Sequence, residues 1–341
     1  MQFISAGKKL YTMQFMTNNT KLLRNSITVG LTTFNAEKSV VNALKSINSQ
    51  TIKPIEIIVV DDCSKDNTFQ ILRNLASKNK LIRILKNNQN RGVAYCRNQI
   101  IDHASGDFIA FFDDDDISIP QRLDIQLKRI LTYESKHKNV HLILCHTPRI
   151  VKYMNQKSIR LGTMGELSVI NAPNGRAVSE RILLGRYLKD GFGSCATSSQ
   201  MARVSTYKFA NGFDVNFRRS EDTELNVRLA ELGCHFIGVK KACVIQYMLK
   251  KNWKTLENEY KFHLMLLRKH KKIIDQYGEY AFSIKWIEVK HIWLKKDFKL
   301  FAPLIIKCIF KHPYLTLRRF LLAIRNIKSN FLFSHYHRSS Q

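Results

Sequence analysis

The chain has 341 residues, 45% of them hydrophobic and 24% charged, which is typical of a folded globular protein with one large domain or two smaller ones. Its seven cysteines are scattered and form no Cys-x-x-Cys pair, so the sequence excludes a disulfide framework and a cysteine-based zinc site and favours a reducing compartment. No run of about 18 uncharged apolar residues and no apolar stretch of signal-peptide type occurs, so we expect a cytoplasmic protein without a transmembrane helix.

Short apolar segments alternate with amphipathic helical periods over residues 26–150. The predicted strands are 26–34, 55–60, 82–87, 107–112 and 140–146, and the predicted helices are 39–49, 68–77, 94–103 and 121–133. Strands that alternate with helices of this length favour an α/β fold whose mainly parallel sheet is covered on both faces. In such sheets ligands bind beyond the carboxyl ends of the strands.

The rest of the chain divides at about residue 250. Before it, the predicted elements are helices at 180–188, 205–209 and 221–233 and strands at 195–203, 235–239 and 243–249. After it we expect only helices, at 253–277, 281–296 and 315–327, with Pro303 and Pro313 breaking the segment between the last two. This pattern predicts an N-terminal extension (1–25), an α/β domain (26–250) and a helical region (251–341).

Positive charge is concentrated in that helical region. From Lys250 to Gln341, twenty Lys and Arg residues stand against six Asp and Glu residues, so half of the net charge of +28 lies there. Such a stretch can contact nucleic acid or an anionic membrane surface, or can be a solvated face. The aromatic residues Phe282, Trp286 and Trp293 recur at helical core spacing, which disfavours a nucleic-acid platform. Basic residues with Trp, Phe and Leu favour helices on a membrane surface, and packing on the preceding domain is the alternative.

The segment "FIAFFDDDDIS" (108–118) has four aspartates directly after an apolar strand. One acidic residue is enough to cap the following helix, whereas four adjacent carboxylates repel one another. A divalent cation removes that repulsion, and Mg²⁺ is typically held by one or two carboxylates together with phosphate oxygens. Residues 113–116 therefore predict a site for Mg²⁺ or Mn²⁺, with a solvated capping turn as the alternative.

A second acidic cluster follows the predicted strand at 55–60, in "VVDDCSKD". Asp66 is expected to cap the helix that begins at Asn67. Asp61 and Asp62 lie at the carboxyl end of the strand, where a carboxylate can accept a hydrogen bond from a ribose hydroxyl or a base N–H. These two residues are candidate nucleotide contacts.

Three segments, in order, resemble the GT-A-fold, family 2 inverting glycosyltransferases. They are "ITVGLTTFNAEKSVVNALKSINSQTIKPIEIIVVDDCSKDNT", "NRGVAYCRNQIIDHASGDFIAFFDDDDISIP" and "ANGFDVNFRRSEDTELNVRLAELG". The resemblance implies that 26–250 is a GT-A catalytic domain with a mainly parallel central sheet. It also implies transfer of a sugar from a nucleotide-sugar donor, a UDP-sugar, to a lipid-linked glycan acceptor in cell-surface polysaccharide or lipopolysaccharide biosynthesis, with Mg²⁺ or Mn²⁺.

The resemblance implies roles for individual residues as well. The donor-binding residues would be Thr32, Thr33, Phe34, Asp61, Asp62, Arg97, Asp113 and Asp115. The first three would border the base and ribose, and Asp61 and Asp62 would contact a uracil-type base and its ribose. Asp115 would lie beside the ribose and the metal, and Asp116 would bind the metal. For Arg97 the alternative is an ordinary arginine on a helix surface.

For the general base the resemblance points to Asp222, with Glu221 beside it, in "RRSEDTEL". The alternative is a pair that stabilises a helix start, because acidic residues in the first turn complement the helix dipole. Asp214 in the "NGFD" turn is a candidate acceptor contact.

Two other functions stay open at this point. A sugar-nucleotide nucleotidyltransferase would share the alternating fold and the acidic metal site, but "TTFNAEKS" after the first strand is no glycine-rich phosphate loop. A basic nucleic-acid-binding protein would show affinity that falls steeply with salt. The preferred interpretation is a glycosyltransferase at the inner face of the cell membrane, with an anionic membrane surface as a partner and no nucleic acid.

Overall fold

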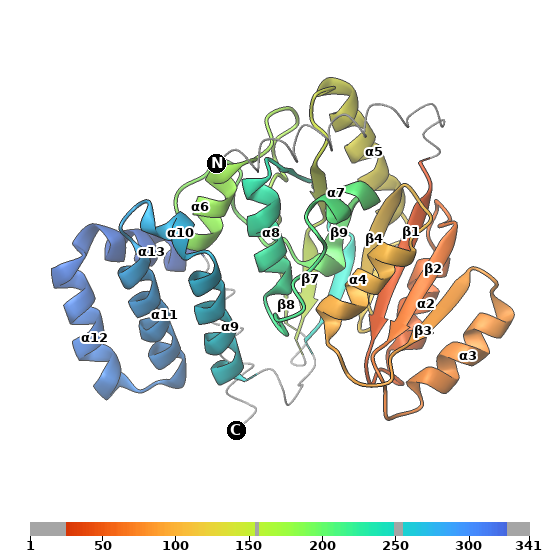
Figure 1. Cartoon of the computed structure of the whole chain (residues 1–341), viewed down its shortest axis with the longest axis horizontal. Coiled ribbons are helices and arrows are strands. Elements are labelled where there is room, and N and C mark those ends of the chain that lie inside the picture. The colour runs from red at the N-terminus through yellow and green to blue at the C-terminus, as the bar shows by residue number, and fades with distance from the viewer. Residues whose placement is uncertain (1–24, 154–156, 249–254, 326–341) are drawn as a thin grey trace.

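A computed structural model describes residues 25–153, 157–248 and 255–325. Within these ranges the strands form a seven-stranded and a four-stranded sheet, flanked by helices (Figure 1). The large sheet contains β1 (Ile27–Thr33), β2 (Glu56–Asp61), β3 (Ile82–Lys86), β4 (Phe108–Asp113), β6 (Ile143–His146), β9 (Gln200–Arg203) and β10 (His235–Gly238). The small sheet contains β5 (Asp116–Ser118), β7 (Arg149–Lys152), β8 (Ser158–Leu161) and β11 (Val244–Tyr247).

The helices of the α/β part are α2 (Val40–Asn48), α3 (Thr68–Lys78), α4 (Val93–His103), α5 (Arg122–Lys136), α6 (Arg176–Leu184), α7 (Val204–Phe209) and α8 (Glu221–Glu231). A short 3₁₀ turn, Thr197–Ser199, precedes β9. The helices that follow are α9 (Leu256–Lys269), α10 (Lys271–Asp275), α11 (Tyr280–Lys295), α12 (Phe298–Lys311) and α13 (Pro313–Arg325). The predicted N-terminal extension, apart from Asn25, lies outside the described residues.

The large sheet has the order β10-β6-β9-β4-β1-β2-β3. The pairs β1–β2, β1–β4, β2–β3 and β6–β10 are parallel, whereas β9 runs antiparallel to both of its neighbours, β4 and β6. The predicted mainly parallel sheet is therefore confirmed, with one reversed strand that the sequence pattern does not mark.

Helices cover both faces of this sheet, which explains why its strands are apolar on both sides. Side chains of α2, α3 and α5 pack with Phe108, Ala110 and Phe112 on one face, and those of α4, α7 and α8 pack with Ile109 and Phe111 on the other. In Figure 1, α4, α7 and α8 lie in front of the sheet. The core thus holds β1 and β4, whose carboxyl ends carry the predicted site residues, rigidly in the middle of the domain.

Several predicted helix boundaries were wrong. The helix expected at 180–188 spans Arg176–Leu184 and ends because Gly185 adopts a left-handed conformation (φ 68°). The single helix expected up to residue 277 is two helices, α9 and α10, that meet at His270, and its predicted first residues lie outside the described ranges. Pro303 does not interrupt α12, and Pro313 is the first residue of α13, where its missing N–H costs no helical hydrogen bond.

The C-terminal helices pack on the α/β part through α6 and α8 (Figure 1). The contact is apolar and includes Leu183 and Leu184 of α6, Val227 of α8, and Phe262 and Leu266 of α9. Further from this contact, α12 and α13 pack on α11 through a smaller cluster. No helix within the described ranges combines the length and the apolar character that crossing a bilayer requires.

Candidate active site

The carboxyl ends of β1, β2 and β4 meet at one edge of the large sheet. The strand registers pair Thr33 with Asp61 and Thr32 with Asp113. The two acidic clusters therefore lie on either side of the carboxyl end of β1. Thr33 Oγ1 donates a hydrogen bond to Asp61 Oδ1 at 3.3 Å. Parallel pairing therefore brings together strand-end residues that the sequence analysis identified as donor contacts.

Asp61 and Asp62 order the loops at this edge. Asp61 is fully buried and accepts a hydrogen bond from the backbone amide of Ser64 at 3.2 Å. Asp62 accepts from the backbone amides of Arg91 at 2.8 Å and Gly92 at 2.7 Å, which fixes the loop leading into α4. Both carboxylates thus shape the edge of the site, and their contact with a nucleotide stays a prediction.

The turn that contains the four aspartates is hydrogen-bonded to the residue after β1. Asp114 is buried, and its Oδ2 accepts a hydrogen bond from the backbone amide of Phe34 at 3.1 Å. The Phe34 side chain itself is 39% exposed, and Asp115 next along the turn is half-buried. The predicted base-bordering residue Phe34 is therefore held directly against the predicted metal motif.

Asp116 is more deeply buried than the other aspartates of the motif. Its side chain is 4% exposed, and among the described residues neither carboxylate oxygen has a hydrogen-bond partner. Burial, Asp113 and Asp115 raise its pKa well above its ordinary value, against smaller opposing effects of Arg149 and the nearby Ser198 hydroxyl. A buried carboxylate in this state is costly unless a proton or a cation neutralises it, so Asp116 fits a divalent-metal ligand.

The described residues do not surround an ion completely. No group of three or more His, Cys, Asp or Glu side chains in these ranges is arranged to hold a metal by itself. Mg²⁺, however, usually keeps several waters and binds through one or two carboxylates plus phosphate oxygens. The arrangement is therefore suited to a cation that arrives with a phosphate-bearing ligand.

Arg97 is buried, so the alternative of a surface arginine was wrong. This residue of α4 has a side chain that is 5% exposed, with Nη2 3.1 Å from Asp113 Oδ1 and Nη1 2.6 Å from Glu221 Oε1. Burial alone would lower the pKa of Arg97, but these two carboxylates raise it. Arg97 therefore joins the end of β4 to the start of α8, and any donor contact of its own stays a prediction.

Glu221 and Asp222 begin α8 in different environments. Glu221 is buried, and burial together with Asp222 raises its pKa to about 7, although Arg97 opposes the shift. Asp222 is half-buried, and its Oδ1 accepts a hydrogen bond from the amide of Thr223 at 2.6 Å. Asp222 thus makes a local contact in the first turn, as the capping alternative expects, and its role as a base stays a prediction.

Nothing in the sequence pattern marks Arg149 of β7, which the fold brings to the metal motif. Arg149 is buried, donates to Gln246 Oε1 at 2.8 Å and to Ser194 Oγ at 2.6 Å, and its charge lowers the pKa of Asp116. The pairing of β7 and β5 with β11 creates this proximity, and those strands are distant in sequence. The positive charge of Arg149 beside Asp116 favours the binding of an anionic ligand at the site.

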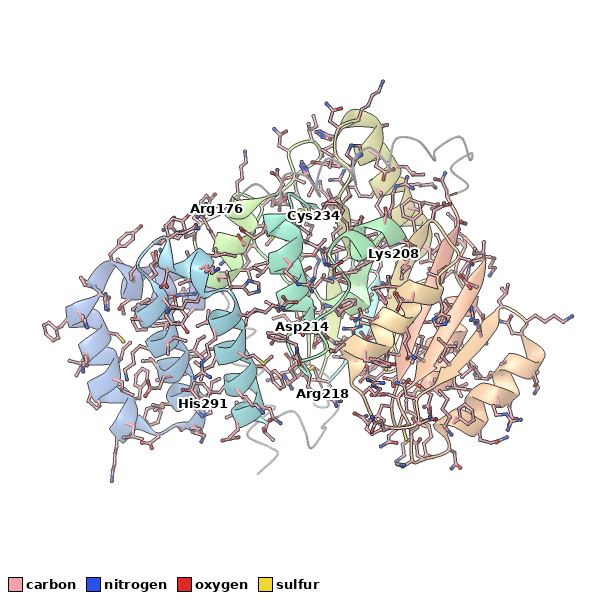
Figure 2. All side chains as sticks on the ribbon, viewed as in Figure 1. Arg176, Lys208, Asp214, Arg218, Cys234 and His291 are labelled. Carbon is pink, nitrogen blue, oxygen red and sulfur yellow. The ribbon has the colours of Figure 1, made fainter. Side chains whose placement is uncertain are left out.

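Two other acidic residues have structural partners. Asp66 accepts from the backbone amide of Thr68 at 3.0 Å, so the predicted capping contact exists although Asn67 occupies the N-cap position. Asp214 Oδ2 lies 2.6 Å from Nζ of Lys269. In Figure 2, Asp214 lies below the N-terminal end of α8, on the segment that also carries Arg218. Asp214 is therefore part of a structural ion pair, and its contact with an acceptor stays a prediction.

Residues 28–138 match the family described as Glycosyl transferase family 2. The chain contains a glycosyl transferase family 2 domain. The match runs from β1 through α5 and so includes both acidic clusters and Arg97, whereas the start of α8 lies beyond it.

Curated relatives of this domain are glycosyltransferases. The Escherichia coli protein named UDP-Glc:alpha-D-GlcNAc-diphosphoundecaprenol beta-1,3-glucosyltransferase WfgD is 37% identical over 106 residues, which is 31% of this chain and 41% of WfgD. The Campylobacter jejuni protein named GalNAc(5)-diNAcBac-PP-undecaprenol beta-1,3-glucosyltransferase is 40% identical over 91 residues, which is 26% of this chain and 29% of that protein. The chain spans less than half the length of the curated relatives it matches.

Solved structures of Staphylococcus aureus TarS share the fold. TarS 1–349 in complex with UDP-GlcNAc has a TM-score of 0.53 and 20% identity, over 78% of this chain and 72% of that chain. TarS 1–349 alone has a TM-score of 0.51 and 17% identity, over 93% of this chain and 92% of that chain. The predicted GT-A fold is thereby confirmed. The family domain also favours a glycosyltransferase over the alternative of a sugar-nucleotide nucleotidyltransferase.

Proposed function

We propose that this chain is an inverting glycosyltransferase that moves a sugar from a nucleotide-sugar donor, a UDP-sugar, to a glycan acceptor in cell-surface polysaccharide or lipopolysaccharide biosynthesis. The observation that carries the proposal is that Arg97 forms ion pairs with two acidic residues that are distant in sequence. They are Asp113 at the end of β4 and Glu221 at the start of α8. Asp116 lies three residues after Asp113 and Asp222 directly follows Glu221, so these contacts support a site that has both a metal beside the leaving group and a base for the acceptor. The family 2 domain and the names of its curated relatives support the same activity.

The donor would bind at the carboxyl edge of β1, β2 and β4. Thr32, Thr33 and Phe34 would border the base and ribose, and Asp61 and Asp62 would contact them. Asp115 and Asp116 would hold Mg²⁺ or Mn²⁺, which when bound neutralises the negative charge that develops on the departing nucleoside diphosphate. Arg149 would add positive charge beside this diphosphate, since it already acts on Asp116 electrostatically.

Asp222 would accept the proton of the acceptor hydroxyl. The hydroxyl oxygen forms a bond to the anomeric carbon while the bond from that carbon to the diphosphate oxygen breaks, so the configuration at carbon inverts. The proton passes to the Asp222 carboxylate, and the electron pair of the broken bond leaves with the nucleoside diphosphate. Glu221, fixed by Arg97 and with a pKa of about 7, would hold the start of α8 in place beside Asp222.

The activity is tested by incubating the protein with a panel of nucleotide sugars, with and without Mn²⁺, and measuring released nucleoside diphosphate. We expect release from a UDP-sugar that depends on the metal and is lost in Asp116→Asn. The matched control is Asp102→Asn, which removes an exposed carboxylate of α4 and should keep the wild-type rate. No release from any nucleotide sugar, or equal metal-independent release by both variants, would contradict the proposal.

We also propose that α12 and α13 bind an anionic membrane surface. The exposed apolar side chains of these helices are Phe298, Leu300, Ile306, Ile309, Phe310, Tyr314, Leu317, Phe320, Leu321 and Ile324. Phe310 is 84% exposed and Tyr314 is 73% exposed, and Lys299, Lys307 and Lys311 are exposed on α12. Apolar side chains together with lysines are typical of helices that lie in the headgroup region of anionic membranes.

A membrane position would bring the site near a lipid-linked acceptor. WfgD and the Campylobacter jejuni relative are named for substrates linked to diphosphoundecaprenol or PP-undecaprenol. All seven cysteines are free, which fits the cytoplasmic face of the cell membrane.

Sedimentation with vesicles tests this surface. We expect the full chain to sediment with vesicles that contain anionic lipid, more weakly at high salt, and the double variant Phe310→Ser, Leu317→Ser to stay in the supernatant. Leu167→Ser removes an exposed leucine elsewhere (68% exposed) and should bind as the wild type does. Failure of the full chain to bind anionic vesicles at low salt would leave α12 and α13 as a structural cover only.

A further inference from the structure

The first turn of α8 carries three acidic residues with different partners. Glu221 faces Arg97, and Asp222 is half-buried beside it. Glu224 has no exposed surface and accepts hydrogen bonds from Nε of Arg228 at 2.8 Å and from Nη2 at 2.7 Å. Residues three apart on a helix are neighbours on its surface, so a contact that fixes Glu224 also fixes Glu221 and the helix start.

A lysine from the C-terminal helices reaches this turn. Lys269, the last residue of α9, has its Nζ 2.5 Å from Glu224 Oε1 and 2.6 Å from Asp214 Oδ2. Burial alone would raise the pKa of Glu224, but its contacts with His270, Arg228 and Lys269 lower it to about 2. Glu224 is therefore ionised at neutral pH, and Lys269 bridges two carboxylates, one on α8 and one on the preceding loop.

That loop is also bound to α4. The side-chain amide of Asn98 accepts from the backbone N–H of Phe213 at 2.7 Å and donates to its carbonyl at 2.8 Å. Arg228 donates to the carbonyl of Gly212 at 2.7 Å. Asn98 directly follows Arg97 on α4, and Arg97 contacts Asp113 and Glu221. A chain of contacts therefore runs from α9 through the loop to α4.

The apolar contact around Lys269 does not by itself require this lysine. Phe217, Val227, Phe262 and Leu266 would still hold α9 against α8 if the ammonium group were removed. A buried ion pair often adds little net stability compared with apolar side chains of the same volume. At this position the ion pair instead restricts how α9 is placed relative to α8, because Lys269 must lie within reach of Glu224 and Asp214 simultaneously.

We infer that Lys269 is a positioning residue that holds the start of α8, so that the C-terminal helices are a working part of the proposed acceptor side. The effect on sugar transfer rests on the proposed function. The link between Lys269 and the first turn of α8 does not, and it can be measured without any substrate.

Hydrogen exchange of the full chain tests the link first. In Lys269→Met the backbone amides of Glu224, Leu225 and Phe217 should exchange at least about tenfold faster than in the wild type, which corresponds to about 1.4 kcal/mol of lost stabilisation. Amides of α2 should be unchanged. The control Lys272→Met removes an exposed lysine of α10 and should change none of these rates. Unchanged exchange at the start of α8 in Lys269→Met would overturn the inference, whatever the enzyme assays show.

Kinetics then test the consequence. Lys269→Met should lower the rate of transfer to an acceptor by at least about tenfold, because small misplacements of catalytic groups can cost about 10²-fold, while hydrolysis of the nucleotide sugar by water and UDP binding stay within about twofold. Lys269→Arg should restore much of the transfer. Equal loss of transfer and hydrolysis, in proportion to the folded fraction, would reduce Lys269 to a purely structural role and overturn the inference.

Discussion

Replacing Arg97 by methionine tests how the two acidic sites are held together. The arginine is 4% exposed and lies 3.1 Å from Asp113 and 2.6 Å from Glu221. Removing one partner of a buried ion pair costs about 3–5 kcal/mol, because the remaining charge is left uncompensated. The Asp113 side chain is 28% exposed and can be hydrated, so the cost arises mainly at Glu221. We expect the free energy of unfolding to fall by about 3 kcal/mol near pH 8.

The size of this loss should depend on pH through Glu221. The folded protein already raises the pKa of Glu221 from its ordinary 4.5 to about 7, and loss of Arg97 removes a lowering influence. An acid whose pKa is higher in the folded state destabilises the fold above its unfolded pKa. This cost is absent below about pH 4.5 and grows as the pH rises to the folded pKa. The variant should therefore lose less stability near pH 5.5 than near pH 8.

Urea unfolding followed by circular dichroism at the two pH values measures the effect. Arg73→Met, at an exposed position of α3, is the control and should change the free energy of unfolding by less than about 0.5 kcal/mol. A loss below about 1 kcal/mol for Arg97→Met, equal at both pH values, would refute the reasoning.

Three further changes probe the site and its support. Asp116→Asn should stabilise the metal-free protein by about 1–3 kcal/mol, since it removes a buried carboxylate whose oxygens have no hydrogen-bond partner in the described part of the chain. Thermal unfolding should show stabilisation by Mn²⁺ with UDP only in the wild type, and a lower melting temperature of the metal-free variant would contradict this. Asp222→Asn should reduce transfer by about 10²–10⁴-fold with UDP binding by calorimetry unchanged, whereas an active Asp222→Asn beside an inactive Glu221→Gln would exchange their roles. Gly30→Ala should lower the free energy of unfolding in urea by about 1–3 kcal/mol, because its Cβ would lie 2.5 Å from Ile100, and an unchanged value would mean that α4 shifts freely.

The parallel core and the edge that carries the acidic clusters could be predicted from the sequence. Apolar runs such as Phe108–Phe112 are buried on both faces of a parallel sheet, so they stand out without any periodicity. Once the strands are parallel, Asp61 and Asp113 must end at the same edge, and the registers with Thr33 and Thr32 confirm it. That part of the site follows from local pattern and topology together.

The residues that connect the site could not be predicted, because their environment is built by distant segments. From the sequence, Arg97 could equally be an arginine on a helix surface, because its partner Glu221 comes from the distant helix α8. Pro303 predicts a helix break, yet it lies inside α12, where Ile305 and Cys308 after it are buried in a cluster with side chains of α11. Lys269 reads as one of many lysines in a basic region, and only the packing of α9 on α8 gives it two carboxylate partners.

The reversed strand β9 imposes an order on assembly during synthesis. It lies between β4 and β6, and β6 and β10 join the sheet through it. Yet β9 is made roughly 90 residues after the end of β4, which is roughly 5–20 s at the rate of a ribosome. During that interval the strand that ends in Asp113 has one edge whose N–H and C=O groups lack a strand partner, and such edges recruit other chains. We therefore expect the nascent chain to be most prone to aggregate when the whole family-matched segment, 28–138, has been made and β9 has not.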